Sequence, residues 1–194
     1  MTEREKMLAG ELYDCGDAEL LAQWHKAKNL TRAYSDLASE DLPAKEQLLR
    51  QLLGGFGKSL WVTPPFFVDY GCNIFLGDNC EINANCTFLD CASIRIGSNA
   101  LVAPNVQIYT AFHPASAQER FGTPRAEGSF AFCKTLTAPV TIGDNVWLGG
   151  GAILLPGVTL GDNVVIGAGS VVTHDIPSNS VAYGNPCQVI RQNL

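Results

Sequence analysis

Aliphatic side chains recur at every sixth position in the last third of the chain. The series is Ile142, Leu148, Leu154, Leu160, Ile166 and Val172. A small or β-branched residue stands four positions after each member: Val146, Ala152, Val158, Val164, Ser170 and Ile176. A period of six fits neither a helix nor a hairpin array. It predicts a solenoid in which three hexads, about 18 residues, form one triangular coil.

The same spacing occurs earlier in the chain, in two registers. The first holds Leu76, Ile82, Phe88 and Ile94, and the second resumes two residues late at Ile96, Val102 and Ile108. Pairs that tolerate tight or left-handed backbone stand where coil corners are expected: Asp78-Asn79, Ser98-Asn99, Asp144-Asn145 and Asp162-Asn163. Asparagine and aspartate suit such corners, which supports the solenoid.

The first third of the chain has helical signals instead. Thr2 and Glu5 form a capping box, Asp17 can cap a second helix, and Pro43 suits the first turn of a third that stops at Gly54-Gly55. We therefore predict a helical region over residues 1–55, followed by a β-helix over 56–194. The repeat is interrupted over residues 110–139, which predicts a long loop.

Composition narrows the function classes. The 194 residues are 46% hydrophobic and 16% charged, which excludes a disordered chain. The net charge of −6 argues against a nucleic-acid partner. No stretch stays apolar long enough to cross a membrane, so we expect a cytoplasmic protein. The seven cysteines include no Cys-x-x-Cys pair and are expected to be free thiols.

Several motifs together resemble the maltose and galactoside O-acetyltransferase family of hexapeptide-repeat proteins. They are Met7-Leu8-Ala9-Gly10-Glu11-Leu12-Tyr13, Asp69-Tyr70-Gly71 with Asn73-Ile74, Ile108-Tyr109-Thr110-Ala111 with His113-Pro114, Ile142-Gly143-Asp144-Asn145-Val146-Trp147, and Gly184-Asn185-Pro186. The resemblance implies a mainly β fold, the left-handed parallel β-helix. It also implies acetyl transfer from acetyl-coenzyme A to a sugar hydroxyl by a homotrimer.

His113 is the candidate catalytic residue. It stands at the root of the loop, and Pro114 holds its backbone extended. A sugar hydroxyl that attacks a thioester needs a base that exchanges protons near neutral pH, and histidine suits this. From the residues alone an ordinary loop histidine is an equal alternative; the resemblance implies the family's catalytic histidine. The thioester is already activated, so neither a metal nor an acyl-enzyme is required.

Four short polar side chains beside the first coils are candidates for binding the acceptor. They are Asp69, Asn83, Asn85 and Asp90. The resemblance implies acceptor contacts at Asp69 and Asn83. For Asn83 and Asn85, a purely structural role at a coil corner is an equal alternative. The chain departs from the family pattern at Glu81, where an aromatic residue is expected, and at Cys15, where an acceptor-binding aspartate is expected.

Coenzyme A contacts are implied by the resemblance at Gly150, Ala168, Thr173, His174 and Arg191. Arg191 and His174 are basic, which suits the phosphates of this ligand. A second arginine of the family pattern is replaced by Gln188. Trp147 should point outward, onto either the ligand or a neighbouring subunit.

Two further functions stay open at this point. Another hexapeptide acyltransferase would use an amine or an amino-acid hydroxyl as acceptor, and a non-catalytic β-helix scaffold would use none. A zinc site of three histidines is not expected, because the chain has only His25, His113 and His174 and the first lies in the helical region.

Overall fold

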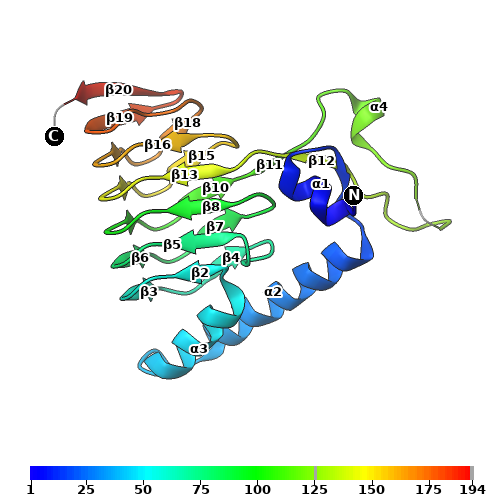
Figure 1. The fold of residues 1–194 in the computed structure, drawn as a ribbon, viewed down its shortest axis with the longest axis horizontal. Coiled ribbons are helices and arrows are strands. Elements are labelled where there is room, and N and C mark those ends of the chain that lie inside the picture. The colour runs from blue at the N-terminus through cyan, green and yellow to red at the C-terminus, as the bar shows by residue number, and fades with distance from the viewer. Residues whose placement is uncertain (125, 193–194) are drawn as a thin grey trace.

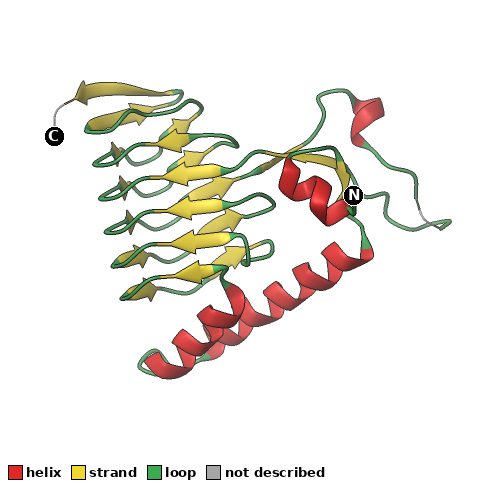
Figure 2. Cartoon of the chain, in the orientation of Figure 1, coloured by secondary structure: helices red, strands yellow, loops and turns green. Residues whose placement is uncertain are grey.

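The computed structural model describes residues 1–124 and 126–192, and it confirms the predicted left-handed parallel β-helix. Short strands stack into a triangular prism with helices at its base (Figures 1 and 2). The first face consists of β2 (Gly55–Phe56), β5 (Ile74–Leu76), β8 (Ile94–Ile96), β13 (Val140–Ile142) and β16 (Thr159–Leu160).

The other two faces follow the same stacking. The second face consists of β3 (Leu60–Val62), β6 (Cys80–Ile82), β9 (Leu101–Val102), β14 (Trp147–Leu148), β17 (Val165–Ile166), β19 (Ser180–Gly184) and β20 (Cys187–Gln192). The third face consists of β4 (Phe66–Val68), β7 (Cys86–Leu89), β10 (Gln107–Tyr109), β15 (Ile153–Leu154) and β18 (Val171–Val172). Each corner takes the number of the face that precedes it along the chain, so the first corner follows the first face.

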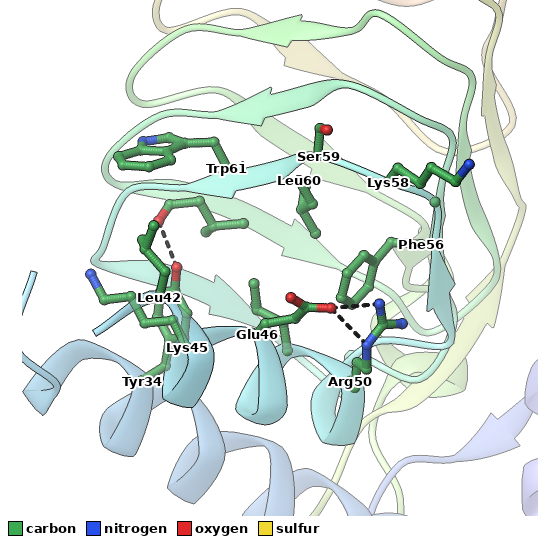
Figure 3. Close-up of a pocket in the computed structure, with 13 residues that line it drawn as sticks. Tyr34, Leu42, Lys45, Glu46, Arg50, Phe56, Lys58, Ser59, Leu60 and Trp61 are labelled. Carbon is green, nitrogen blue, oxygen red and sulfur yellow. Dashed lines mark hydrogen bonds and ion pairs between the residues drawn. The ribbon is translucent and has the colours of Figure 1, made fainter. Parts of the chain in front are cut away.

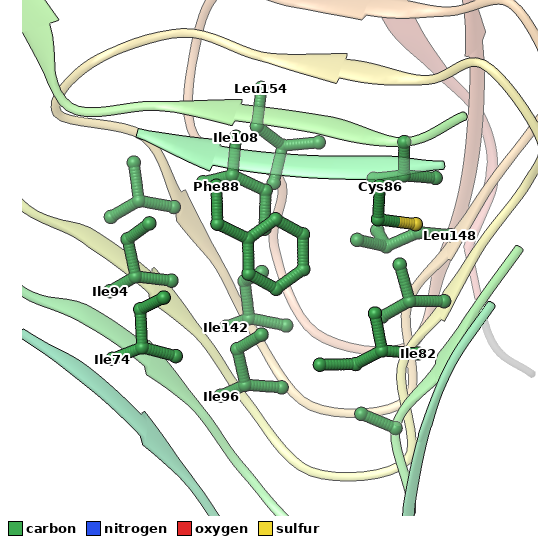
Figure 4. Close-up of a cluster of buried hydrophobic side chains, with 14 of the residues drawn as sticks. Ile74, Ile82, Cys86, Phe88, Ile94, Ile96, Ile108, Ile142, Leu148 and Leu154 are labelled. Atoms are coloured by element: carbon green, nitrogen blue, oxygen red, sulfur yellow. The ribbon is translucent and has the colours of Figure 1, made fainter. Parts of the chain in front are cut away.

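The hexad aliphatics fill the inside of the prism. In Figure 4 the labelled side chains form columns, with Ile74 below Ile94 on one side and Ile82 on another. Cys86 and Phe88 are fully buried in the same cluster, as the repeat predicts. Because each side chain touches its equivalents in the coils above and below, the core is continuous along the prism axis.

Coil length differs from the expected 18 residues in the first half of the prism. Phe75 pairs with Arg95, 20 residues later, whereas Thr141 pairs with Thr159, 18 residues later. The two extra residues lie at the third corner, just before β8, in which both Ile94 and Ile96 are buried. This explains why the sequence pattern shifts by two residues at that point.

The first corner is held by two ladders of polar side chains. Asparagines with positive φ follow one another up the prism, and each amide donates to the next at 2.9–3.0 Å: Asn79, Asn99, Asn145, Asn163 and Asn179. Beside them, Asp144 Oδ1 accepts from the backbone N–H of Ser98 at 2.7 Å, and Asp162 Oδ1 accepts from that of Asp144 at 2.8 Å. The predicted corner residues therefore also join coil to coil.

Two helices close the base of the prism. Helix α2 (Ala18–Asp36) begins at the Asp17 cap, and α3 (Leu42–Leu52) has Pro43 in its first turn, both as predicted. Ala27 and Tyr34 of α2 and Leu49 and Leu52 of α3 belong to the same hydrophobic cluster as the coils. At this join, Tyr34 donates its hydroxyl hydrogen to Val62 O at 2.6 Å, and Arg50 pairs with Glu46 beside a cavity of about 390 Å³ (Figure 3).

The remaining N-terminal segment pairs with the loop that interrupts the repeat. Helix α1 (Glu3–Ala9) has the predicted capping box, and β1 (Tyr13–Asp14) joins β12 (Lys134–Thr137) and β11 (Ala111–Phe112) in a small antiparallel sheet. Helix α4 (Ala117–Arg120) lies part-way along this loop, away from the prism, in Figure 1. The loop leaves the prism at the third corner and returns to it at β13.

The top of the prism ends in an antiparallel hairpin. Strand β19 pairs in parallel with β17, and β20 folds back along β19 on the second face. No helix among the described residues is long and apolar enough to cross a membrane.

The ladder at the first corner can be tested at Asn163, which has φ +56 and whose amide donates to Asn179. Asn163→Ala should lower the free energy of unfolding more than Asn163→Gly. Both variants lose the ladder contacts, and alanine adds about 1–2 kcal/mol of left-handed strain. Urea unfolding of the two variants measures the difference. A glycine variant clearly less stable than the alanine variant would contradict this account of the corner.

Candidate functional site

His113 lies where the loop leaves the third corner, immediately after β11. Its side chain is exposed, and its Nδ1 lies 2.9 Å from the carbonyl oxygen of Lys134 in β12. Because a carbonyl oxygen can only accept, Nδ1 carries the hydrogen and Nε2 keeps its lone pair. Thr135 Oγ1 lies 3.4 Å from the same nitrogen. The sheet between the loop ends thus fixes the tautomer that a general base needs.

A cavity of about 600 Å³ opens beside His113. It lies between α2, β1 and the third corner, and much of its wall is apolar or aromatic. The lining residues are Tyr13, Cys15, Leu21, Trp24, His25, Asp69, Tyr70, Leu89, Cys91, Ala111, His113, Phe132 and Thr135. Burial raises the pKa values of Tyr13, Tyr70 and Cys91, so these groups are neutral at pH 7.

Asp69 is the predicted acceptor residue that shares this cavity with His113. Its Oδ1 accepts from Trp24 Nε1 at 3.2 Å and lies 3.5 Å from Lys28 Nζ. Its Oδ2 lies 3.5 Å from Cys91 Sγ, which donates to it. The carboxylate is therefore held in place by helix α2 on one side and by the corner on the other.

Asp90 has a structural role, contrary to the expectation that it binds the acceptor. Its side chain is 0% exposed, and its carboxylate accepts from the backbone N–H groups of Asp69 at 3.1 Å, Tyr70 at 2.8 Å and Asn73 at 3.1 Å. Burial raises the pKa of Asp90 to about 6. With its oxygens engaged below the cavity, Asp90 shapes the corner that presents Asp69.

Asn83 and Asn85 lie at the second corner, on a different edge of the prism from His113. Asn85 has φ +64 and donates to Asn105 Oδ1 at 2.6 Å. It therefore has the structural role at a coil corner that the sequence left open. Asn83 donates to Glu81 Oε1 at 3.2 Å and accepts from the backbone of Ala84 at 3.1 Å.

The residues predicted to bind coenzyme A are divided between edges and faces. Gly150 and Ala168 stack at the second corner above Asn83, where Gly169 N–H donates to Gly150 O at 2.9 Å. Thr173 and His174 follow β18 at the third corner, 2.7 Å apart between Oγ1 and Nδ1.

Two further candidates lie on the second face. Trp147 is 52% exposed between Leu101 and Val165, which confirms that it points outward. Arg191 lies on β20, opposite Val181.

Sequence reasoning missed the contribution of α2 to the cavity. His25 is exposed and lines the cavity with its ring edge-on to Trp24 at 5.2 Å. Lys28 lies over the Trp24 ring at 4.6 Å. Trp24, His25 and Lys28 stand at helical spacing, which is the one signal that could have placed them on a common face.

Comparisons with known proteins agree with the fold. Residues 6–57 match the model of the maltose acetyltransferase hexapeptide capping motif. Residues 139–174 match the bacterial transferase hexapeptide of six repeats, and residues 73–110 match the hexapeptide repeat of succinyl-transferase.

Individual relatives align along the whole chain. A maltose O-acetyltransferase structure from Clostridium difficile 630 is 49% identical with a TM-score of 0.91, covering 100% of this chain and 98% of that one. A galactoside acetyltransferase structure in complex with coenzyme A is 36% identical with a TM-score of 0.88, covering 99% and 91%. The galactoside O-acetyltransferase of Escherichia coli K12 is 38% identical over 99% of this chain and 90% of its own. This chain therefore belongs to the maltose and galactoside O-acetyltransferase family of hexapeptide-repeat acetyltransferases.

Proposed function

We propose that the protein moves the acetyl group of acetyl-coenzyme A to a hydroxyl of a mono- or oligosaccharide, with His113 as general base. The observation that carries the proposal is the hydrogen bond from His113 Nδ1 to Lys134 O at 2.9 Å. It leaves Nε2 free to take a proton at the edge of a cavity that can hold a small acceptor.

The reaction then needs no metal and no covalent enzyme intermediate. Nε2 accepts the proton of the sugar hydroxyl while the hydroxyl oxygen attacks the thioester carbonyl. A backbone N–H of the coil donates to the oxyanion that forms. The C–S bond then breaks, and the imidazolium returns the proton to the departing thiolate of coenzyme A.

The acceptor would occupy the cavity beside His113. Asp69 is the carboxylate on that wall, and its oxygens can accept from sugar hydroxyls while Trp24 and Lys28 hold it in place. The aromatic rings around it suit the apolar face of a sugar ring. Asn83 would complete the acceptor site only if it came from a second subunit, because it lies on another edge of the prism.

A homotrimer would bring the two edges together. In a threefold ring, the third corner of one subunit faces the second corner of the next, and His113 then meets the neighbour's copy of Asn83. Exposed side chains on the second face support a subunit contact, since Trp61 is 54% exposed and Leu101 and Trp147 follow it in register, two and three coils further up, with Glu81 between Trp61 and Leu101.

The acetyl donor would lie along the upper coils between subunits. Gly150 and Ala168 offer backbone groups at the second corner, Arg191 offers positive charge for phosphates, and His174 offers a ring nitrogen that can bond to them. The galactoside acetyltransferase whose structure holds coenzyme A shares this fold along 99% of the chain.

All seven cysteines are free thiols, which fits a reducing compartment, and we place the protein in the cytoplasm.

The alternatives differ in what they transfer. A scaffold would release no thiol from acetyl-coenzyme A with any acceptor, and an N-acyltransferase would respond to amines. Thiol release measured with a panel of sugars, amino sugars and serine separates the three. The tautomer of His113, with the hydrogen on Nδ1 and a free Nε2, favours an enzyme over a scaffold.

His113→Ala should lower kcat by about 10²–10⁴, the usual contribution of a positioned general base. The melting temperature and the affinity for acetyl-coenzyme A should stay unchanged, because the His113 side chain is exposed and lies outside the core. Thiol release from acetyl-coenzyme A measures the rate. A folded variant that keeps more than about a third of the wild-type kcat, far above this range, would exclude His113 as the base.

Arg191→Ala should raise the KM for acetyl-coenzyme A about tenfold to a hundredfold and change kcat less. A charge-assisted phosphate contact is worth about 1.5–3 kcal/mol. Initial rates at saturating acceptor measure both constants, and Arg95→Ala on the first face serves as a control for lost charge. An unchanged KM would place the phosphates elsewhere.

The trimer should appear in sedimentation equilibrium as a species of three times the 20.8 kDa chain mass. Mixing two inactive variants, His113→Ala and Asn83→Ala, under conditions of subunit exchange should restore part of the activity, because some sites then combine two intact halves. A stable, active monomer at micromolar concentration contradicts the shared site.

A further inference from the structure

Two cysteines from distant parts of the chain meet beside the cavity. Strand β1 pairs with β12 so that Tyr13 opposes Thr135 and Asp14 opposes Lys134. The same register, carried on by one residue, places Cys15 opposite Cys133. Cys15 Sγ donates to the carbonyl oxygen of Cys133 at 3.1 Å, so the two residues are in direct contact.

This placement suits a covalent cross-link. Directly opposite residues of antiparallel strands have Cα atoms about 4.5–5.5 Å apart and side chains on the same side. A disulfide spans Cα separations of about 4.4–6.8 Å. Both thiols are free and half-buried. On its other side, Cys133 forms an antiparallel β-bridge with Phe121. The backbone of Cys133 therefore lies between β1 and another part of the loop.

The pair lies one residue from the group that orients His113. Cys133 precedes Lys134, whose carbonyl accepts from His113 Nδ1 at 2.9 Å. Cys15 lines the same cavity as His113 and Asp69. A bond between the two sulfurs would replace the contact between Cys15 Sγ and the Cys133 carbonyl, and it would lock β1 to β12 beside the group that orients His113.

We propose that Cys15 and Cys133 form an oxidisable thiol pair, which a low-molecular-weight disulfide converts to a cross-link that inhibits acetyl transfer. The formation of the cross-link is inferred from the geometry of the two cysteines. Its inhibitory effect rests on the proposed function. The cross-link would tie the N-terminal segment to the loop that carries the catalytic histidine.

The chemistry proceeds by two exchanges. The Cys133 thiolate attacks one sulfur of the small disulfide, forming a mixed disulfide and releasing one thiolate. The Cys15 thiolate then attacks the Cys133 sulfur and releases the second thiolate. The protein loses two hydrogens, and the small disulfide is reduced to two thiols. Burial raises the pKa of Cys15 and so lowers its thiolate fraction, which makes Cys15 the slower thiol toward the small disulfide. Its contact with Cys133 favours the second, intramolecular step instead.

The other cysteines offer controls. Cys80 and Cys86 are buried in the prism core, and Cys91 is buried with its Sγ donating to Asp69. Cys72 is exposed at the foot of the prism, and its Sγ lies 3.9 Å from Asn73 Oδ1 in the same segment. Cys72 can therefore form a mixed disulfide with a small thiol, whereas Cys15 and Cys133 can close on each other.

The experiment treats the intact native protein with oxidised glutathione and then blocks the remaining thiols. Peptide mass mapping should find Cys15 joined to Cys133. Acetyl transfer should fall at least fivefold and return after dithiothreitol. Cys133→Ser should keep its activity under the same treatment, and Cys72→Ser should behave as the wild type.

Distinct results would overturn the proposal. Glutathione attached to Cys133 without closure, or a cross-link of Cys15 to another cysteine, would exclude the thiol pair. A Cys15–Cys133 cross-link with unchanged activity would exclude the inhibition. If the reduced protein transfers no acetyl group to any acceptor, the proposed function fails, while mass mapping still decides whether the thiol pair exists.

Discussion

The close stacking of coils at the first corner is the constraint on which the rest of this structure depends. A Cβ built at Gly143 would lie 2.3 Å from Asp162 Oδ1 and 2.8 Å from the Asp162 nitrogen, so the corners of adjacent coils fit together only without a side chain there. The residue two positions later, Asn145, has φ +58, and its side-chain amide donates a hydrogen bond to Asn163 in the next coil. Because both positions recur, every coil is placed directly above the one before, and the inward columns of aliphatic side chains follow.

Accurate stacking also explains how a long loop can leave the prism without disturbing it. Across the interruption, Arg95 still pairs with Thr141, Leu101 with Trp147 and Gln107 with Ile153, each 46 residues later. The loop ends are held by their own antiparallel sheet with β1, which supplies the carbonyl that orients His113. The catalytic candidate thus belongs to a second structural unit, attached to the prism at one corner and stabilised by the N-terminal segment.

The solenoid and its helical cap could be predicted from the sequence because their signals are local and repeated. The hexad series, the corner asparagines, the Asp17 cap and Pro43 each act within a few residues of the chain. The small sheet could not be predicted, since β1 has two residues and pairs with strand β12 more than a hundred positions away. The role of Asp90 was also hidden, because a buried carboxylate that binds backbone N–H groups and an exposed one look alike in the sequence. The contribution of α2 to the cavity was hidden for a related reason: the face of α2 that meets the cavity is decided by packing against the third corner.

The two ends of the prism have a consequence for assembly. A stack of parallel strands has unpaired backbone groups at both ends, and such edges can recruit a further copy of the same edge. Here α2 and α3 cover the lower end, and the antiparallel turn of β20 along β19 breaks the parallel repeat at the upper end. Copies of this chain are thereby blocked from adding head to tail into a fibre, and association is directed to the sides of the prism.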